Sequence, residues 1–251
     1  MSPTTGDGHA STLPDAAATA ASNAKPIYLI PGGHPPDGKQ TLAAISAVYR
    51  ACAVAAPTVA YIGTANHDSK MFFQMMKTQL LKAGAAIVTL APIAGKRANR
   101  ETARKIIEAA DCVFLSGGEV EDGIRLLHAA GLDDFLREQY QSGKLFFGVS
   151  AGCIMMGQYW VHWDVEDDDS TASLFDCLNF VPLTFDTHCE DEDWKELRCA
   201  LRLLGPGAAG YGLSTNGFYS AISSGKLTSY RNDPAVLRNV DGYIQAVKWD
   251  A

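Results

Sequence analysis

The chain is poor in cysteine, and the few cysteines that it has are spread thinly. Six cysteines occur in 251 residues, and no two of them form a CxxC pair. Secreted domains that depend on disulfides are instead dense in cysteine. We therefore expect reduced thiols and a cytoplasmic location.

The sequence also lacks an excess of positive charge and a long hydrophobic run. Lysine and arginine number 21 against 28 aspartate and glutamate residues, and the formal net charge is −7. Nucleic-acid binding requires clustered basic residues, so we expect no nucleic-acid partner. Apolar stretches end well before the roughly 20 residues that cross a bilayer, so we also expect no membrane partner.

The N-terminal segment has neither the basic start nor the apolar centre of a secretory signal. Small and polar residues dominate it, MSPTTGDGHASTLPDAAATAASNA. Such a composition predicts a disordered tail over residues 1–24. The remaining residues, 25–251, are predicted to form a single domain, for which a hydrophobic fraction of 47% is ample.

Apolar runs alternate with amphipathic segments through the first 150 residues. Strands are expected at 25–30, 57–65, 85–92, 111–118 and 144–150, and helices at 41–55, 71–84, 98–110 and 121–143. This order predicts an α/β three-layer sandwich with a mostly parallel central sheet. After residue 160 the pattern changes, and a helix is expected at DEDWKELRCALRLL (191–204). In the final third, 209–250, short alternating runs between turn residues favour antiparallel strands at an edge.

The segment GVSAG, residues 148–152, lies between an expected strand and an expected helix. A G-x-S-x-G turn in this position exposes the serine hydroxyl, because the flanking glycines let the neighbouring backbone approach closely. Ser150 is therefore the candidate nucleophile. Cys153 falls in the first helical turn, where its side chain points back along the helix, and we expect it in the core.

Two backbone N–H groups are candidates to stabilise an oxyanion near Ser150. The N–H of Ala151 begins the helix after the turn. The second is that of Gly118, in the segment FLSGGEV that ends the fourth strand.

A serine nucleophile needs a general base, and His188 is the preferred candidate because it follows a strand-like run, NFVPLTFDTH. His162, in WVHWD, is the alternative, although a histidine between aromatic residues is more often structural. The acid that orients the base stays open among Asp164, Glu166 and the run Asp167 to Asp169.

The sequence from about residue 25 to 225 resembles the S51 serine peptidases, the group that contains dipeptidase E and cyanophycinase. Three segments carry the resemblance: IIEAADCVFLSGGEVEDGIRLL, GVSAG and FDCLNFVPLTFDTH. The resemblance implies the class I glutamine amidotransferase-like fold, which is flavodoxin-like.

The resemblance also implies roles for single residues. Ser150 is the nucleophile, His188 the base, and Gly118 with Ala151 the oxyanion donors. The acidic member falls in WDVEDDD, which places it at Asp164, Glu166 or Asp168.

The resemblance places the substrate at Gly117, Glu119 and Val120. The family usually has Asn-Thr or Asp-Gln where Glu119 and Val120 stand, so the preference of dipeptidase E for aspartate is not transferred. Near the C-terminus the family tends to show G-I/L-x-E-G. This chain has GLSTNG there, in which Thr215 and Asn216 supply no carboxylate.

The expected function is a serine peptidase that cleaves small peptides or isopeptide-like amides through an acyl-enzyme, with no cofactor and no metal. One alternative is a catalytically silent member that binds or regulates through a small molecule. Another is an esterase or amidase that acts on non-peptide substrates. The partner is then a small peptide or amide, and the sequence leaves a homodimer open.

Three further motifs resemble functional sites or stripes, but a structural role explains each of them. GHPPDGKQT (33–41) resembles a phosphate-binding loop, but Gln40 replaces the metal-binding hydroxyl and two prolines remove N–H donors. The acidic residues of WDVEDDD lack the glycine of a calcium loop. The MFFQMM stripe (71–76) is expected to pack in the core.

Overall fold

The structure, a computed structural model, describes residues 23–32, 38–165 and 168–250. Residues 1–22 of the predicted tail, most of the loop at 33–41, and both Glu166 and Asp167 therefore lie outside the described residues. Within the described ranges, none of the helices combines the length and the apolar character that crossing a membrane requires.

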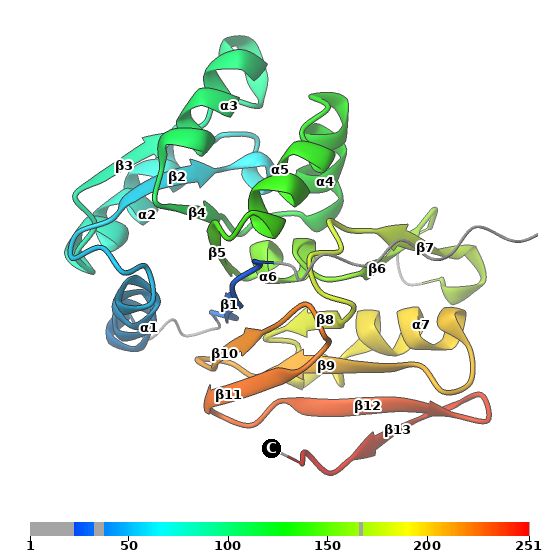
Figure 1. Ribbon diagram of the computed structural model, residues 1–251. Helices are drawn as coiled ribbons and strands as arrows, with labels where there is room; N and C mark the ends of the chain where they lie inside the picture. Colours follow the sequence, from blue (N-terminus) through cyan, green and yellow to red (C-terminus); the bar gives the residue numbers. More distant parts are fainter. Residues whose placement is uncertain (1–22, 33–37, 166–167, 251) are drawn as a thin grey trace, which may run out of the picture.

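The main sheet has seven strands and is mostly parallel (Figure 1). Its strands are β1 (Ile27–Ile30), β2 (Thr58–Ile62), β3 (Ile87–Leu90), β4 (Cys112–Leu115), β5 (Leu145–Val149), β10 (Phe218–Ala221) and β11 (Leu227–Arg231). They lie in the order β11-β10-β1-β5-β4-β2-β3. The five strands from β1 to β3 run parallel, and β10 and β11 add an antiparallel edge beside β1.

Helices cover both faces of the main sheet, as the expected sandwich requires. They are α1 (Gly38–Arg50), α2 (Lys70–Lys82), α3 (Arg100–Ala109), α4 (Val120–Ala129), α5 (Asp133–Gln141) and α6 (Ala151–Met155). Phe114 of β4 packs with α1 and α2, whereas its neighbours Val113 and Leu115 pack with α3 to α6. Successive side chains of a strand point to opposite faces, so apolar residues at every position of β4 produce a sheet buried on both sides.

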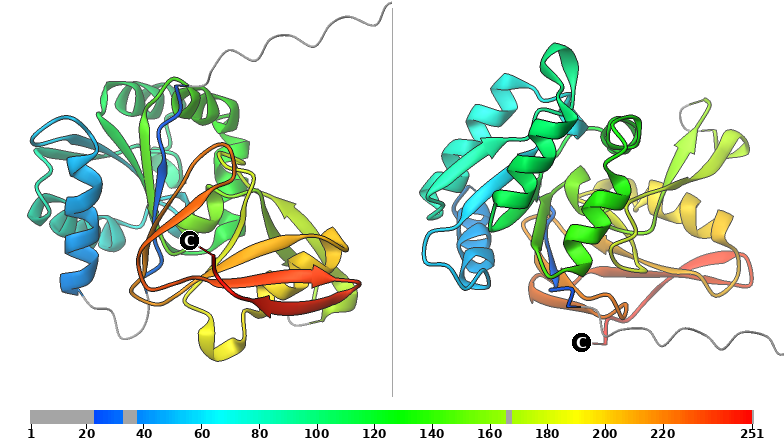
Figure 2. Two further views of the ribbon diagram at one scale, coloured as in Figure 1. Left: turned by 60° about the horizontal axis from the view of Figure 1, so that its bottom comes forward. Right: turned by 45° about the horizontal axis from the view of Figure 1, so that its top comes forward.

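A second sheet lies beside the main one, shown in yellow to red in Figure 2. Its strands are β8 (Thr184–Thr187), β9 (Ala209–Leu213), β12 (Ala235–Val240) and β13 (Tyr243–Val247), in the order β13-β12-β9-β8. The helix α7 (Lys195–Leu204) connects β8 to β9, which pair in parallel. A hairpin of β6 (Tyr159–Trp163) and β7 (Ala172–Asp176) precedes this sheet.

The expected strands and helices of the first 150 residues are all present, with shorter bounds, and three expectations differ. Within residues 209–250 the pairings β9–β12, β12–β13 and β10–β11 are antiparallel as expected, but β9 also pairs in parallel with β8 across α7. The acidic run that was expected inside a helix forms a 3-10 turn (Glu190–Glu192) ahead of α7. The prediction that the MFFQMM stripe packs in the core is wrong, since Met71 and Met75 are exposed and only Met76 among its methionines is buried.

Candidate active site

Ser150 occupies a strained turn between β5 and α6. Its φ of 52° and ψ of −122° lie outside the regions that residues with a side chain favour. The Ser150 N–H donates to the Ile30 carbonyl at 3.1 Å, which ties the turn to the end of β1. Strain of this kind is found at functional sites, where the surrounding structure holds it in place.

The two glycines of the GVSAG turn are required by close backbone contacts. A Cβ on Gly148 would lie 2.5 Å from the Gly152 carbonyl carbon, and a Cβ on Gly152 would lie 2.2 Å from the Leu115 carbonyl oxygen. Both distances are far below van der Waals contact. Because both residues lack a side chain, the start of α6 can pack closely against β5 and β4. This packing sets the position of Ser150.

His188 reaches Ser150 from the other sheet. It follows β8 directly, has a φ of 46°, and donates its backbone N–H to Leu213 of β9 at 3.1 Å. Its ring Nε2 lies 2.8 Å from the Ser150 Oγ. The carboxyl ends of two strands in different sheets thus bring a hydroxyl and an imidazole into hydrogen-bond contact.

The turn after β4 carries Gly117 and Gly118, and Gly117 lies against Ser150. Gly118 has a φ of 141°, and a Cβ there would lie 1.9 Å from the Ala65 carbonyl oxygen. That same oxygen accepts the Glu119 N–H at 2.7 Å, while the Asn66 side chain donates to the Gly117 carbonyl at 2.8 Å. These contacts hold the SGG turn against the end of β2.

Gly118 and Ala151 both line a cavity of about 380 Å³ that is also lined by Ser150 and His188. Within the described ranges, neither of their backbone N–H groups donates to an acceptor. Two such donors near one hydroxyl can stabilise a negative oxygen that forms there.

The cavity wall is acidic. Among its described residues are no lysine and no arginine. It is formed by Gly118, Glu119, Val120, Glu121, Asp122, Ser150, Ala151, Ile154, Trp160, Asp186, Thr187, His188, Cys189 and Glu196. The predicted substrate residues Glu119 and Val120 belong to it, whereas Gly117 lies against Ser150, where an added Cβ would be 3.3 Å from the Ser150 Cβ.

The structure gives the predicted acid Asp164 another partner. Its carboxylate lies 3.3 Å from the Nε2 of His162, it is largely exposed, and it is not among the described residues that form the cavity wall. The Asp168 carboxylate accepts from the backbone and the hydroxyl of Ser170. Asp169 pairs with Arg202 and accepts from the Trp163 indole N–H. The other two candidates, Glu166 and Asp167, lie outside the described residues.

The alternative base, His162, contacts the carboxylates of Glu121 and Asp164 with its two ring nitrogens. Its Nδ1 lies 2.9 Å from Glu121, and this hydrogen bond raises the pKa of the imidazole. The structure therefore brings His188, and not His162, to the Ser150 hydroxyl.

Cys153 lies in the core, as expected. Its side chain is buried, and its thiol donates to the Gly148 carbonyl at 3.3 Å. Burial raises the pKa of this thiol above its ordinary value, which disfavours the reactive thiolate.

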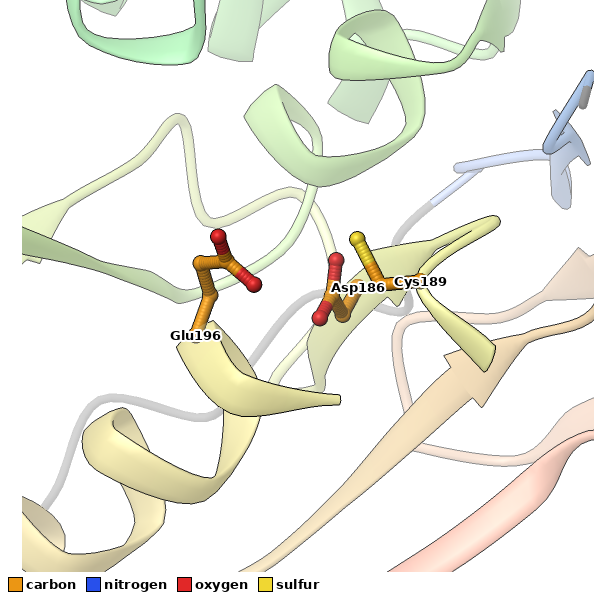
Figure 3. A group of neighbouring side chains, drawn as sticks. All are labelled: Asp186, Cys189 and Glu196. Carbon is orange, nitrogen blue, oxygen red and sulfur yellow. The ribbon is translucent and has the colours of Figure 1, made fainter. Parts of the chain in front are cut away.

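Sequence reasoning missed a carboxylate pair in the cavity wall, formed by Asp186 and Glu196 with the Cys189 thiol beside them (Figure 3). Asp186 is 1% exposed, and its Oδ1 accepts the Thr187 N–H at 2.7 Å. Burial, and next the charge of Glu196, raises the pKa of Asp186 to about 7. The signal that could have revealed it is an aspartate inside the otherwise uncharged strand TFDT.

Comparison with known proteins identifies the family and the fold. A family model described as peptidase family S51 matches residues 27–214. A crystal structure titled as a peptidase E protein from Listeria monocytogenes EGD-e is 17% identical, with a TM-score of 0.61, and the alignment covers 84% of this chain and 100% of that one. A structure titled as a peptidase from an acI-B1 Actinobacterium is 14% identical, with a TM-score of 0.63, covering 89% and 94%. No curated protein matches the chain.

Proposed function

Because the chain belongs to peptidase family S51, we propose that it is a serine peptidase that hydrolyses small peptides or isopeptide-like amides. In this proposal Ser150 is the nucleophile and His188 the general base. The observation that carries this proposal is the 2.8 Å contact between the Ser150 Oγ and the His188 Nε2, at the carboxyl end of the parallel strand β5. Ligands of open parallel sheets bind at this edge.

The first step forms an acyl-enzyme. His188 takes the proton of the Ser150 hydroxyl while the Oγ bonds to the substrate carbonyl carbon, and the carbonyl oxygen becomes negative. The N–H groups of Gly118 and Ala151 would donate to that oxygen. The carbon–nitrogen bond then breaks, and the amine leaves with the proton that His188 carried.

The second step releases the acyl group. A water molecule gives its proton to His188 as its oxygen bonds to the acyl carbon, and the bond to Ser150 breaks with return of the proton to the Oγ. The elements of one water molecule are thereby added across the amide bond.

The size of the cavity supports small substrates. At about 380 Å³ it is near the lower end of the range of small-molecule sites, roughly 300 to 1,000 Å³. A peptide bond with one or two flanking residues fits such a volume better than a folded protein does.

The acid that orients His188 stays a prediction. Asp164 contacts His162, Asp168 contacts Ser170 and Asp169 pairs with Arg202, so Glu166 and Asp167 are the predicted candidates that remain. In serine hydrolases such an acid holds the imidazole in the tautomer that accepts the hydroxyl proton.

The direct test is labelling of the purified protein with a fluorophosphonate, followed by mass spectrometry of the modified peptide. We expect the label on Ser150 in the native chain and no label in Ser150→Ala. Exchange of His188 for alanine should slow labelling and lower kcat/KM on a cleaved peptide by about 10⁴-fold or more, because the general base is lost.

Cys153→Ser is the matched control for these variants, because it changes the other candidate nucleophile of the same turn. Its labelling should stay close to that of the native chain. A native protein whose Ser150 does not react, although His188 is in place, would favour the catalytically silent alternative.

A further inference from the structure

The acidic residues of the cavity wall differ in whether a basic side chain neutralises them. Glu121 pairs with Arg125 at 2.8 Å and with His162 at 2.8 Å. Asp122 pairs with His67 at 2.9 Å. Among the described residues, Glu119, Asp186 and Glu196 have no such partner, and of these three Glu119 is exposed to solvent.

Asp186 combines deep burial with an unused acceptor. Its side chain is 1% exposed, and its Oδ2 has no hydrogen-bond partner within the described ranges. The residue nevertheless forms part of the wall of the cavity that holds Ser150. A buried carboxylate oxygen without a donor is costly, and natural proteins rarely leave one unless a ligand or water meets it.

Glu196 brings a second unused oxygen to the same place. It projects from the first turn of α7 toward Asp186, and its Oε2 is also buried without a partner (Figure 3). One ligand atom each of Asp186, Cys189 and Glu196 lie within 4.8 Å of one another. A nitrogen that donates to two carboxylate oxygens at about 2.8 Å needs oxygens that are separated by about 4.6 Å.

The one lysine of α7 contacts an aromatic ring, since the Lys195 Nζ lies over the Trp163 ring, 5.8 Å from its centroid. Above the pKa of Asp186, the two carboxylates present negative charge to the cavity, beside the hydroxyl that would attack the substrate.

We propose that Asp186 and Glu196 form a subsite for a cationic nitrogen of the substrate, an ammonium or guanidinium group, next to the bond cleaved at Ser150. This inference rests on the proposed peptidase function. The cation has two sources in a peptide, the free α-amino group and the side chain of lysine or arginine. Either one would donate to the two unused oxygens and offset the charge repulsion between the carboxylates.

A divalent metal is the competing occupant, and the chemistry of Cys189 disfavours it. Metal coordination requires the thiolate. Burial, and next the charges of Asp186 and Glu196, raises the pKa of this thiol above its ordinary value. An amine needs no deprotonation of the thiol and is provided by every peptide with a free N-terminus.

The test compares the binding of four small amides by NMR titration: lysinamide, norleucinamide, Nα-acetyl-lysinamide and Nα-acetyl-norleucinamide. We expect the best cationic compound to bind at least about tenfold more tightly than the neutral acetyl-norleucinamide. Equal affinity of lysinamide and norleucinamide would assign the subsite to the α-amino group. Equal affinity of both lysine compounds would assign it to the side chain.

The pair is tested by Glu196→Gln, with Glu192→Gln as the control. Both variants remove one negative charge from the same segment, but Glu192 is exposed and does not belong to the described cavity wall. Glu196→Gln should weaken the best cationic compound by about tenfold or more, whereas Glu192→Gln should leave its affinity unchanged. Thermal unfolding shows whether both variants are folded. If Glu196→Gln does not fold, Asp186→Asn takes its place and should weaken the same compound.

Three results would overturn the subsite: equal binding of the neutral compound, binding of none of the four compounds, or an unchanged affinity in Glu196→Gln. Tight binding of Zn²⁺ that depends on Glu196, without binding of any amine, would overturn it in favour of a metal site. These measurements do not require turnover. An unreactive Ser150 with selective amine binding would therefore refute the peptidase proposal and leave the cation subsite standing.

Discussion

Ser150 and His188 both have positive φ angles, of 52° and 46°, although neither is a glycine. Left-handed backbone at residues with a side chain costs free energy, of the order of 1 to 3 kcal/mol for strained cases. Here the cost is offset by the surrounding packing, since each residue donates its backbone N–H to the end of a neighbouring strand. The strain places the two side chains against one another.

Asp186 makes the stability of the protein depend on pH. Burial and the charge of Glu196 raise its pKa from 3.8 to about 7, against the opposing effect of the Thr187 N–H, the Cys189 thiol and the Leu197 N–H. Between pH 4 and 7 the folded chain holds a proton that the unfolded chain has released. The contribution of Asp186 to stability is therefore greatest below pH 4, and it is lost as the pH rises through 7.

Asp186→Asn should remove this loss, because asparagine cannot ionise. Relative to the native chain, the variant should gain about 2 to 4 kcal/mol in free energy of unfolding between pH 5 and pH 8, since one pKa unit corresponds to about 1.4 kcal/mol. Urea unfolding at both pH values measures this. Parallel pH profiles of the two proteins would contradict the burial argument.

At the scale of elements, the turn between β4 and α4 determines where Gly118 presents its N–H. A methyl group at Gly118 would meet the Ala65 carbonyl oxygen at 1.9 Å, in a backbone conformation with φ of 141°. Gly118→Ala should therefore displace the turn and lower kcat/KM by about 10²-fold or more, the usual effect of losing one oxyanion donor. Steady-state kinetics on the peptide that the native chain cleaves measures it.

Gly84→Ala is the control for this substitution. Gly84 lies in the loop between α2 and β3 and has a φ of 119°. A Cβ added there would meet no atom within 4 Å. The control introduces similar backbone strain without a clash and away from the cavity wall, so kcat/KM should be retained. Equal losses in both variants would show that strain, and not the position of the turn, controls activity.

Elements with local signals were predicted well, and elements that depend on distant partners were not. The strands β1 to β5 are apolar at most positions and end at turn residues, so their hydrophobic pattern was sufficient. The acidic run at Glu190–Glu192 was expected to start a helix, but α7 begins at Lys195, because Asp193 and Trp194 adopt left-handed backbone. The pattern of Met71 and Met75 did not reveal which side of α2 faces the sheet.

At the scale of the whole molecule, the site depends on how the two sheets pack. Phe185 of β8 is fully buried in the same cluster as Ile154 of α6 and Leu213 of β9. This cluster joins the elements that position Ser150 to those that position His188. The contact between the two side chains is thus a property of the packing of two sheets.

Phe185→Ala should leave a cavity in this cluster and cost about 3 to 5 kcal/mol of stability. At a temperature where the variant is still folded, we also expect slower labelling of Ser150, because β8 can shift and take His188 with it. Phe114→Ala is the matched control, since Phe114 is equally buried but packs on the opposite face of the main sheet. If both variants label at the native rate, the packing of Phe185 does not set the geometry of the pair.

The sequence by itself determined the alternation of strands and helices, the strained turn at Ser150 and the glycines that this turn requires. These features are local, because they follow from hydrophobic periodicity and from backbone conformations within a few residues. The sequence made His188 the preferred base, and the tertiary structure brings its ring to Ser150, 38 positions away. Only the tertiary structure decided that His162 contacts Asp164 and that Asp186 and Glu196 line one cavity. Such contacts depend on the packing of separate sheets and helices, and no pattern within a single segment specifies them.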